Sequence, residues 1–170
     1  MKYIIVALAL FGADLAFAES VKLVVPGEHW SVRFDAPALT IVNEPQATSG
    51  HVYSGTTGRL NLSFHVSPPD CAGGDSSENL YKCFGMKLQQ IPYIIDGSIA
   101  AHEAPSGVQV TYLMETSANE RKVRVFNLNY VFAHNGKWGD LHISVVQPVK
   151  ADLEAVVALM KSLELVDGDK

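Results

Sequence analysis

The sequence predicts an α+β domain in which helices pack against an antiparallel β-sheet and one disulfide pins the fold. Apolar and polar residues alternate in several segments of both halves of the chain, as they do in half-buried strands. Asn135-Gly136 favours a tight hairpin turn. Helical signals occur once in the middle of the chain and once near its end. The order strands, helix, strands, helix is typical of α+β domains rather than wound parallel sheets.

Four strands are predicted before the first helix, at residues 21–25, 29–34, 50–57 and 59–67. The last of these has the clearest period of two, which places its apolar and polar residues on opposite faces: Leu60, Leu62, Phe64 and Val66 on one, and Arg59, Asn61, Ser63 and His65 on the other. We expect the apolar face to lie on a core and the polar face to point toward water or a cleft.

The first helix is expected over residues 76–89. Asp75, followed three residues later by Glu78, resembles a capping box at its start. The helix should end before Pro92, because the residue ahead of a proline avoids helical angles.

The chain contains two cysteines, Cys71 and Cys83, twelve positions apart. In an oxidising compartment such a pair predicts one structural disulfide, here between the first helix and the loop that follows the preceding strand. Closing this short loop adds about 3 kcal/mol of stability on the chain-entropy model. A redox or metal-binding pair is the alternative, but the cysteines have neither CxxC spacing nor a histidine nearby.

The second half of the chain predicts strands at residues 94–102, 108–116, 122–133 and 139–147, and a helix over residues 151–163. This last helix carries one apolar stripe, formed by Leu153, Val156, Val157, Met160 and Leu163.

Residues 1–18 have the pattern of a cleavable signal peptide. Lys2 gives a positive start, residues 3–12 are apolar, and Ala16-Phe17-Ala18 places small residues where a signal peptidase reads them. The apolar core is too short to span a bilayer about 30 Å thick. We therefore expect cleavage after Ala18, and a periplasmic or secreted mature protein that folds as a single α+β domain over residues 19–170. An uncleaved anchor helix is the alternative.

Charge and composition narrow the range of partners. The mature chain keeps the net charge of −5, because the signal peptide contains one lysine and one aspartate. No cluster of lysine or arginine is present, which argues against nucleic acid and against anionic lipid. No second apolar stretch approaches membrane-spanning length, so no span is expected in the mature protein. No glycine-rich phosphate cradle occurs, and no cofactor is expected.

Two of the predicted strands carry polar residues that could meet on one sheet face. His65 lies on one strand, and Asp140 and His142 lie on another. Imidazole and carboxylate are zinc ligands, so a ligand or metal face is one hypothesis, and a solvated sheet face is the alternative. Ser144 extends the Asp140–His142 row, but residues two apart on a strand lie about 7 Å apart, which is too far for a Ser-His-Asp triad.

Two tryptophans are candidates for a contact with another protein. Trp30 and Trp138 both lie near predicted strand ends. Core packing is one role for such aromatic residues, and a partner-contact patch is the other.

The two ends of the mature chain contain four short motifs, at residues 29–37 (HWSVRFDAP), 137–144 (KWGDLHIS), 152–157 (DLEAVV) and 161–163 (KSL). Together these motifs resemble the ends of PsbP-like domains. That superfamily includes the extrinsic subunit of photosystem II and its prokaryotic relatives. The resemblance implies an antiparallel sheet between helices and an accessory, partner-binding role without catalysis. No functional residue carries over, because no binding motif matches position by position.

These observations predict an exported, non-catalytic accessory or binding protein, with an envelope protein as its candidate partner. The sequence has no Gly-x-Ser-x-Gly motif of a nucleophilic serine and no HExxH zinc motif, so an enzyme is not expected. One alternative is a periplasmic metal- or small-ligand-binding domain that uses the polar sheet face. A second alternative is a hydrolase with an unrecognised site.

Overall fold

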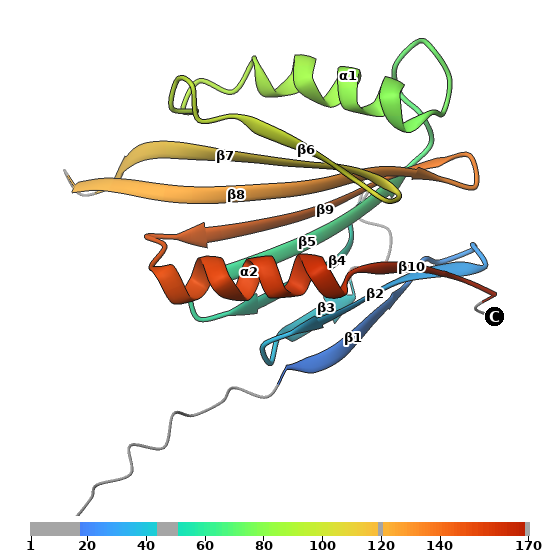
Figure 1. The fold of residues 1–170 in the computed structure, drawn as a ribbon, viewed down its shortest axis with the longest axis horizontal. Helices are drawn as coiled ribbons and strands as arrows, with labels where there is room; N and C mark the ends of the chain where they lie inside the picture. The colour runs from blue at the N-terminus through green and yellow to red at the C-terminus, as the bar shows by residue number, and fades with distance from the viewer. Residues whose placement is uncertain (1–17, 44–50, 119–120, 169–170) are drawn as a thin grey trace, which may run out of the picture.

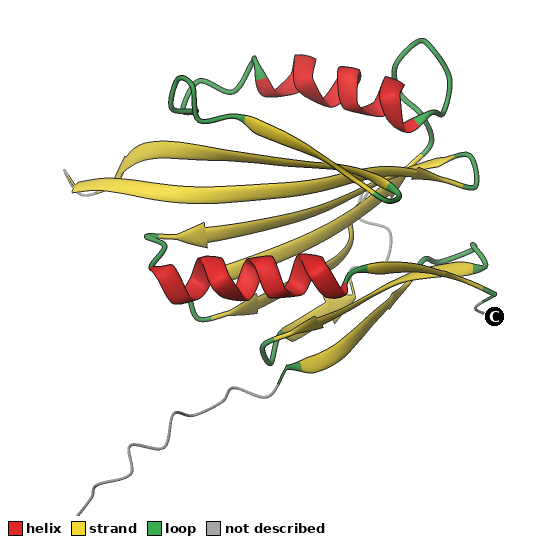
Figure 2. Ribbon diagram, in the orientation of Figure 1, coloured by secondary structure: helices red, strands yellow, loops and turns green. Residues whose placement is uncertain are grey.

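The computed structural model describes residues 18–43, 51–118 and 121–168. These residues form ten strands and two helices (Figures 1 and 2). The strands make one seven-stranded and one three-stranded sheet, both antiparallel. The α+β class, the packing of helices against an antiparallel sheet and the disulfide are confirmed. The division of the strands between two sheets was not evident from the sequence.

The large sheet has the strand order β3-β4-β5-β9-β8-β7-β6. Its strands have the following bounds: β3 Thr40–Asn43, β4 His51–Thr57, β5 Leu60–Ser67, β6 Ala100–Ala104, β7 Gly107–Ala118, β8 Arg121–His134 and β9 Lys137–Val146. The turn between β8 and β9 is the predicted hairpin. Its residues Asn135 and Gly136 have φ angles of 48° and 72°, the positive values that such a tight turn requires.

The small sheet has the order β1-β2-β10, with bounds β1 Glu19–Val24, β2 Trp30–Ala36 and β10 Glu164–Asp167. Helix α2, Lys150–Ser162, packs against β2 and leads directly into β10. Strand β10 was not predicted, because four residues are too few to show a period of two. The short edge strand β3 escaped prediction for the same reason.

The hydrophobic core lies between the large sheet on one side and the small sheet with α2 on the other. Helix α1, Ser77–Leu88, covers the opposite face of the large sheet (Figure 1). The predicted apolar face of β5 points into the core, where it meets alternate residues of the neighbouring strands. The largest fully buried members of this core are Trp30, Phe34, Phe64, Phe132, Leu141, Ile143 and Leu159.

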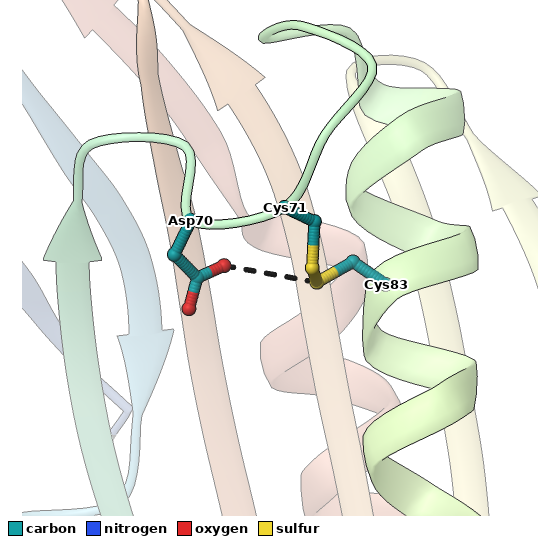
Figure 3. A group of neighbouring side chains, drawn as sticks. All are labelled: Asp70, Cys71 and Cys83. Atoms are coloured by element: carbon teal, nitrogen blue, oxygen red, sulfur yellow. Dashed lines mark hydrogen bonds between the residues drawn. A yellow bond between two sulfur atoms is a disulfide. The ribbon is translucent and has the colours of Figure 1, made fainter.

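Helix α1 is fixed by packing and by the disulfide. Leu80 and Cys83 pack against Val131 and Trp138 of the sheet, and Leu88 packs against β7. The Cys71–Cys83 bond joins the helix to the loop that follows β5, as Figure 3 shows. The helix is therefore held over β7 and β8 rather than over the whole sheet.

Two local expectations need correction. The N-cap of α1 is Ser76 and not Asp75, since the Ser76 hydroxyl accepts a hydrogen bond from the Asn79 N–H at 3.2 Å. Of the strand expected at residues 94–102, only the last three belong to β6, and Ile94 forms an isolated bridge. Gly97 adopts a φ of 72°, so a turn interrupts the segment.

The apolar stripe predicted on the last helix is only partly buried. Val156 and Met160 are buried as expected, and Leu159 joins them. Leu153 and Val157, however, are 37% and 51% exposed. The buried face of α2 is therefore narrower than the sequence pattern suggested, and part of its apolar surface faces outward.

Gly139 on β9 provides a test of the core packing. A Cβ added at this residue would lie 2.2 Å from Cζ of Phe132, its cross-strand partner. We expect Gly139→Ala to lower the free energy of unfolding by about 1–3 kcal/mol, because the Phe132 ring has to leave its packed position. Urea denaturation measures the loss. In a Phe132→Leu background the same substitution should cost clearly less, and an unchanged cost would contradict this packing.

The disulfide provides a second test. Replacing both Cys71 and Cys83 with alanine should lower the free energy of unfolding by about 3 kcal/mol, since the denatured chain gains the freedom of an open loop. Urea denaturation under non-reducing conditions measures the total effect. Hydrogen exchange should show the largest loss of protection in α1, and a uniform loss over both sheets would contradict the role of the bond as a tether of this helix.

Candidate ligand-binding site

The face of the large sheet on the α1 side is divided into an apolar half and a polar half. Under α1 lie apolar residues of β7 and β8, including Val108, Val110 and Val131. Beyond the helix, the same face of β5, β8 and β9 carries polar side chains. We call this region the polar half-face, and it comprises Ser63, His65, Asn127, Asn129, Asp140 and His142.

The structure brings the three predicted site residues to this face. His65 of β5 is the cross-strand partner of Asp140 on β9, and His142 is the partner of Ser63 one step further along the same pair of strands. All three side chains are half-buried. The prediction that His65, Asp140 and His142 share one sheet face therefore agrees with the register.

Two buried asparagines of β8, which the sequence analysis missed, organise the polar half-face. The Asn129 Nδ2 donates to both carboxylate oxygens of Asp140, at 2.8 and 3.0 Å. The Asn127 Nδ2 donates to the Val125 carbonyl, so its Oδ1 is left to accept from His142 Nε2 at 3.1 Å. His142 therefore carries a proton on Nε2.

A signal for both asparagines was present in the sequence. In the predicted strand at residues 122–133, apolar Phe126, Leu128 and Tyr130 alternate with Asn127 and Asn129. Asparagine is depleted in strands, so two in succession on one face of a long strand indicate a polar environment. Their burial could not be foreseen, because it depends on α1 and on the neighbouring strands.

Two unsatisfied polar atoms lie close to this network. Among the described residues, the buried side-chain atoms without a hydrogen-bond partner are Trp30 Nε1, Asn129 Oδ1 and Trp138 Nε1. Leaving such a group unpaired costs roughly 1–3 kcal/mol, and native proteins contain few of them. Asn129 is bonded to Asp140, and Trp138 is two residues from Asp140 on the same face of β9. An unmet acceptor therefore lies in the polar half-face, and an unmet donor lies beside it, beneath α1.

A pocket of about 120 Å³ opens between α1 and the strands β5 and β9. Its polar wall contains His65, Asp140 and Asp70, together with Lys87, which forms an ion pair with Asp70 at 2.7 Å. Its apolar wall contains aromatic rings from both sides, and consists of Leu80, Phe84, Val131 and Trp138. Charged and aromatic groups thus converge on one small cavity, as they do in many small-molecule sites.

The charge of Asp140 affects the pKa of a neighbouring tyrosine, Tyr112. Burial, and secondly the nearby Asp140 carboxylate, raise the pKa of Tyr112 to about 12. Both effects disfavour the tyrosinate anion. The phenol is therefore neutral throughout the physiological pH range.

One group of residues has the spacing of metal ligands. Among the described residues, only Asp70, Cys71 and Cys83 bring three candidate ligand atoms within 4.8 Å of one another (Figure 3). The two sulfur atoms are joined in the disulfide and are not thiolates, so this group does not fit a metal ion. His65, Asp140 and His142 share a face without forming such a group with other described residues.

Both tryptophans are interior residues. Trp30 is 0% exposed and packs edge-on against Phe64 and Phe132, whereas Trp138 is 3% exposed beneath α1. The partner-contact patch considered for this pair is therefore corrected in favour of core packing. Trp138 keeps a second role as a wall of the pocket.

A second hollow is larger and more open. It measures about 780 Å³ and lies between the first turns of α1 and the β6–β7 hairpin, with Glu78, His102, Glu103 and His134 among its lining residues. His134 Nε2 already lies 2.8 Å from Asp167 Oδ1, and His102 and Glu103 are exposed. None of the unsatisfied buried atoms found in the described residues belongs to its lining.

The comparisons with known proteins give no family. No family model matches the chain, and no curated protein is significantly similar to it. Within the described part of the chain, neither helix has the length and apolar character needed to cross a membrane.

Titration of Tyr112 tests the electrostatics of the site. The neutral phenol is favoured by the fold, so the stability it contributes is present below pH about 10 and is lost as the pH rises toward 12. We expect Asp140→Asn to lower the pKa of Tyr112, though not to its ordinary value, because burial is the larger cause. Ultraviolet absorbance of tyrosinate measures this, with Tyr112→Phe to assign the transition. Asp96→Asn, at an exposed turn, is the control. If Asp96→Asn moves the pKa of Tyr112 and Asp140→Asn does not, the contribution of the Asp140 charge is contradicted.

Proposed function

We propose that this chain is an exported, non-catalytic binding protein that takes a small ligand in the pocket between α1 and the polar half-face. The observation that carries the proposal is the convergence on one pocket of the half-buried Asp140 carboxylate, the imidazole of His65 and the aromatic rings of Phe84 and Trp138. Charged, polar and aromatic groups that converge on one concavity are typical of small-molecule sites, whereas a solvated sheet face does not require such a convergence.

Export is part of the proposal. Residues 1–18 carry the signal pattern, and the described fold starts with β1 at Glu19, so cleavage after Ala18 would remove no residue of any described strand. The disulfide is consistent with an oxidising compartment such as the periplasm or the extracellular space.

The hydrogen bonds of the site favour binding over catalysis. The Asp140 carboxylate accepts hydrogen bonds from Asn129, and His142 Nε2 is hydrogen-bonded to Asn127 Oδ1. Asp140, His142 and Ser144 lie on one strand with about 7 Å between successive residues, so they do not form a proton-transfer chain. A hydrolase is accordingly not favoured.

An accessory role with a protein partner is the second candidate. Val149, Leu153 and Val157 of the α2 region are 46%, 37% and 51% exposed, and they repeat at the four-residue spacing of one helix face. Lys150 and Lys161 flank this stripe. An exposed apolar stripe is suited to a partner, and the resemblance of both chain ends to PsbP-like domains supports the same role.

A ligand panel tests the proposed site. Mature, oxidised protein is heated with amines, carboxylates, sugars and divalent metals, and with the same compounds after Asp140→Asn. We expect one compound class to raise the melting temperature of the wild type and to lose most of this effect in the variant, because a ligand that binds only the folded state stabilises it. Asp96→Asn, which removes the same charge at an exposed turn, is the control and should respond like the wild type.

The outcomes separate the candidates. If the stabilising compounds are metals and His142→Ala abolishes the shift, the metal-binding alternative is correct. If no compound class acts, or if Asp140→Asn responds fully, the pocket is not the site. Affinity capture with Val157→Asp as the comparison would then test the exposed stripe of α2.

A further inference from the structure

We infer that the outer edge of β6 binds an extended segment of another protein, which adds to the large sheet as a further strand and places a basic side chain opposite Glu103. The inference goes beyond the small-ligand pocket, because it concerns a different part of the molecule. It draws on the open edge of the sheet, on the hollow along that edge and on the charges around it.

The first observation is an open sheet edge. β6 is the last strand of the large sheet, so one of its sides has no neighbouring strand among those described (Figure 1). Four of its five side chains are exposed. Native proteins guard such an edge with lysine or proline, as β1 of the small sheet does with Lys22. The sequence of β6 (AAHEA) contains neither, so its edge is available for strand addition.

The turn of the β6–β7 hairpin determines which backbone groups lie on that edge. Ala104 pairs with Gly107 across a two-residue turn. The residues that flank such a turn are hydrogen-bonded to each other, and bonded pairs then alternate with non-bonded pairs along an antiparallel ladder. Ala101 and Glu103 belong to the non-bonded pairs, so their backbone N–H and C=O groups point away from β7. An added antiparallel strand would form a bonded pair with each of them.

The hollow between α1 and the β6–β7 hairpin provides room beside this edge. Four consecutive residues of β6, from Ala101 to Ala104, line it. Since neighbouring side chains of a strand point to opposite faces, such a cavity borders the edge of the strand and not one face alone. Tyr81 of α1, which is 38% exposed, also lines the hollow. The side chains of an added strand would therefore have space, and an aromatic ring to contact their apolar parts.

The charges around the edge favour a basic segment. Between Lys87 and Arg121 the sequence contains no lysine or arginine, but four carboxylates. Among the described residues that line the hollow, none is a lysine or an arginine. Glu78 is paired with Lys82 at 2.7 Å, whereas the exposed Glu103 forms no ion pair with another described residue. A basic side chain opposite Glu103 would pair with this carboxylate, and an acidic one would be repelled.

A second copy of this chain is a poorer occupant. Two β6 strands that pair about His102 would place both Glu103 carboxylates on one face of the joined sheet. Each chain also has a net charge of −5, so the two copies repel each other. A basic segment of another protein has neither disadvantage.

Three peptides test the inference on the mature, oxidised protein. They are TVKVT, TVEVT, and TVKVT methylated at the backbone nitrogens of its lysine and its last threonine, all acetylated and amidated. Amide signals of isotope-labelled protein are followed by NMR at millimolar peptide. We expect TVKVT to shift the amides of Ala101 and Glu103 most. TVEVT should bind about three- to tenfold more weakly, because its carboxylate faces Glu103. The methylated peptide should bind about tenfold or more weakly, because it cannot donate to the edge.

Two pairs of variants assign the contacts. Ala101→Pro removes an outward N–H while the bonded pairs of the hairpin remain, and edge strands tolerate proline. It should lose most of the binding of TVKVT, whereas Ala101→Val keeps the N–H and should bind like the wild type. Glu103→Gln should remove most of the preference for TVKVT over TVEVT. Glu154→Gln, on the exposed side of α2, is its control and should keep the preference. The comparison of the three peptides on the wild type needs no variant to fold.

Several outcomes would overturn the inference. The edge is not the site if TVKVT fails to bind, if it shifts only residues away from β6, or if the methylated peptide binds equally well. The basic class is wrong if TVEVT binds as tightly as TVKVT. If the wild type sediments as a dimer that Ala101→Pro dissociates, the occupant is a second copy. None of these results affects the small-ligand pocket, whose test depends on Asp140.

Discussion

Helix α1 is held over one half of the large sheet by the Cys71–Cys83 disulfide and by the burial of Leu80 and Leu88. A 12-residue helix is only marginally stable alone, so its position depends on these attachments. The helix shields β7, β8 and Trp138 of β9, and it leaves His65, Asp140 and His142 half-buried on the same face. The boundary between the covered and the open half creates the pocket.

That boundary also explains the composition of β8. The strand is central in the large sheet and buried on both faces, so an ordinary sequence would place apolar residues at both sets of alternate positions. The side facing the core follows this rule with Leu128, Tyr130 and Phe132. The other side departs from it at Asn127 and Asn129, which lie where α1 ends and the polar half-face begins. Natural proteins break local rules of this kind mainly where a site requires it.

Sequence patterns predicted most of the fold but only part of the candidate site. Long strands such as β5 and β8 were predictable because their period of two runs over many residues, and the hairpin at Asn135-Gly136 because its chemistry is local. Parity placed His65 and Asp140 on the polar side of their own strands, but that β5 pairs with β9 and brings them together could not be read from it. The pairing of β10 with β2 and the burial of Asn129 depend on contacts between distant segments, which periodicity does not encode.

The net charge of the chain says little about the electrostatics of the pocket. Exposed pairs such as Glu78–Lys82 act in water, where salt screens them and their contribution is small. Asp140 is different, because protein shields it on several sides and its charge reaches the buried phenol of Tyr112. In such surroundings a charge acts more strongly and over a longer distance. A ligand in this pocket would contact α1 as well as β5 and β9, so binding would also stabilise the contact between α1 and the sheet.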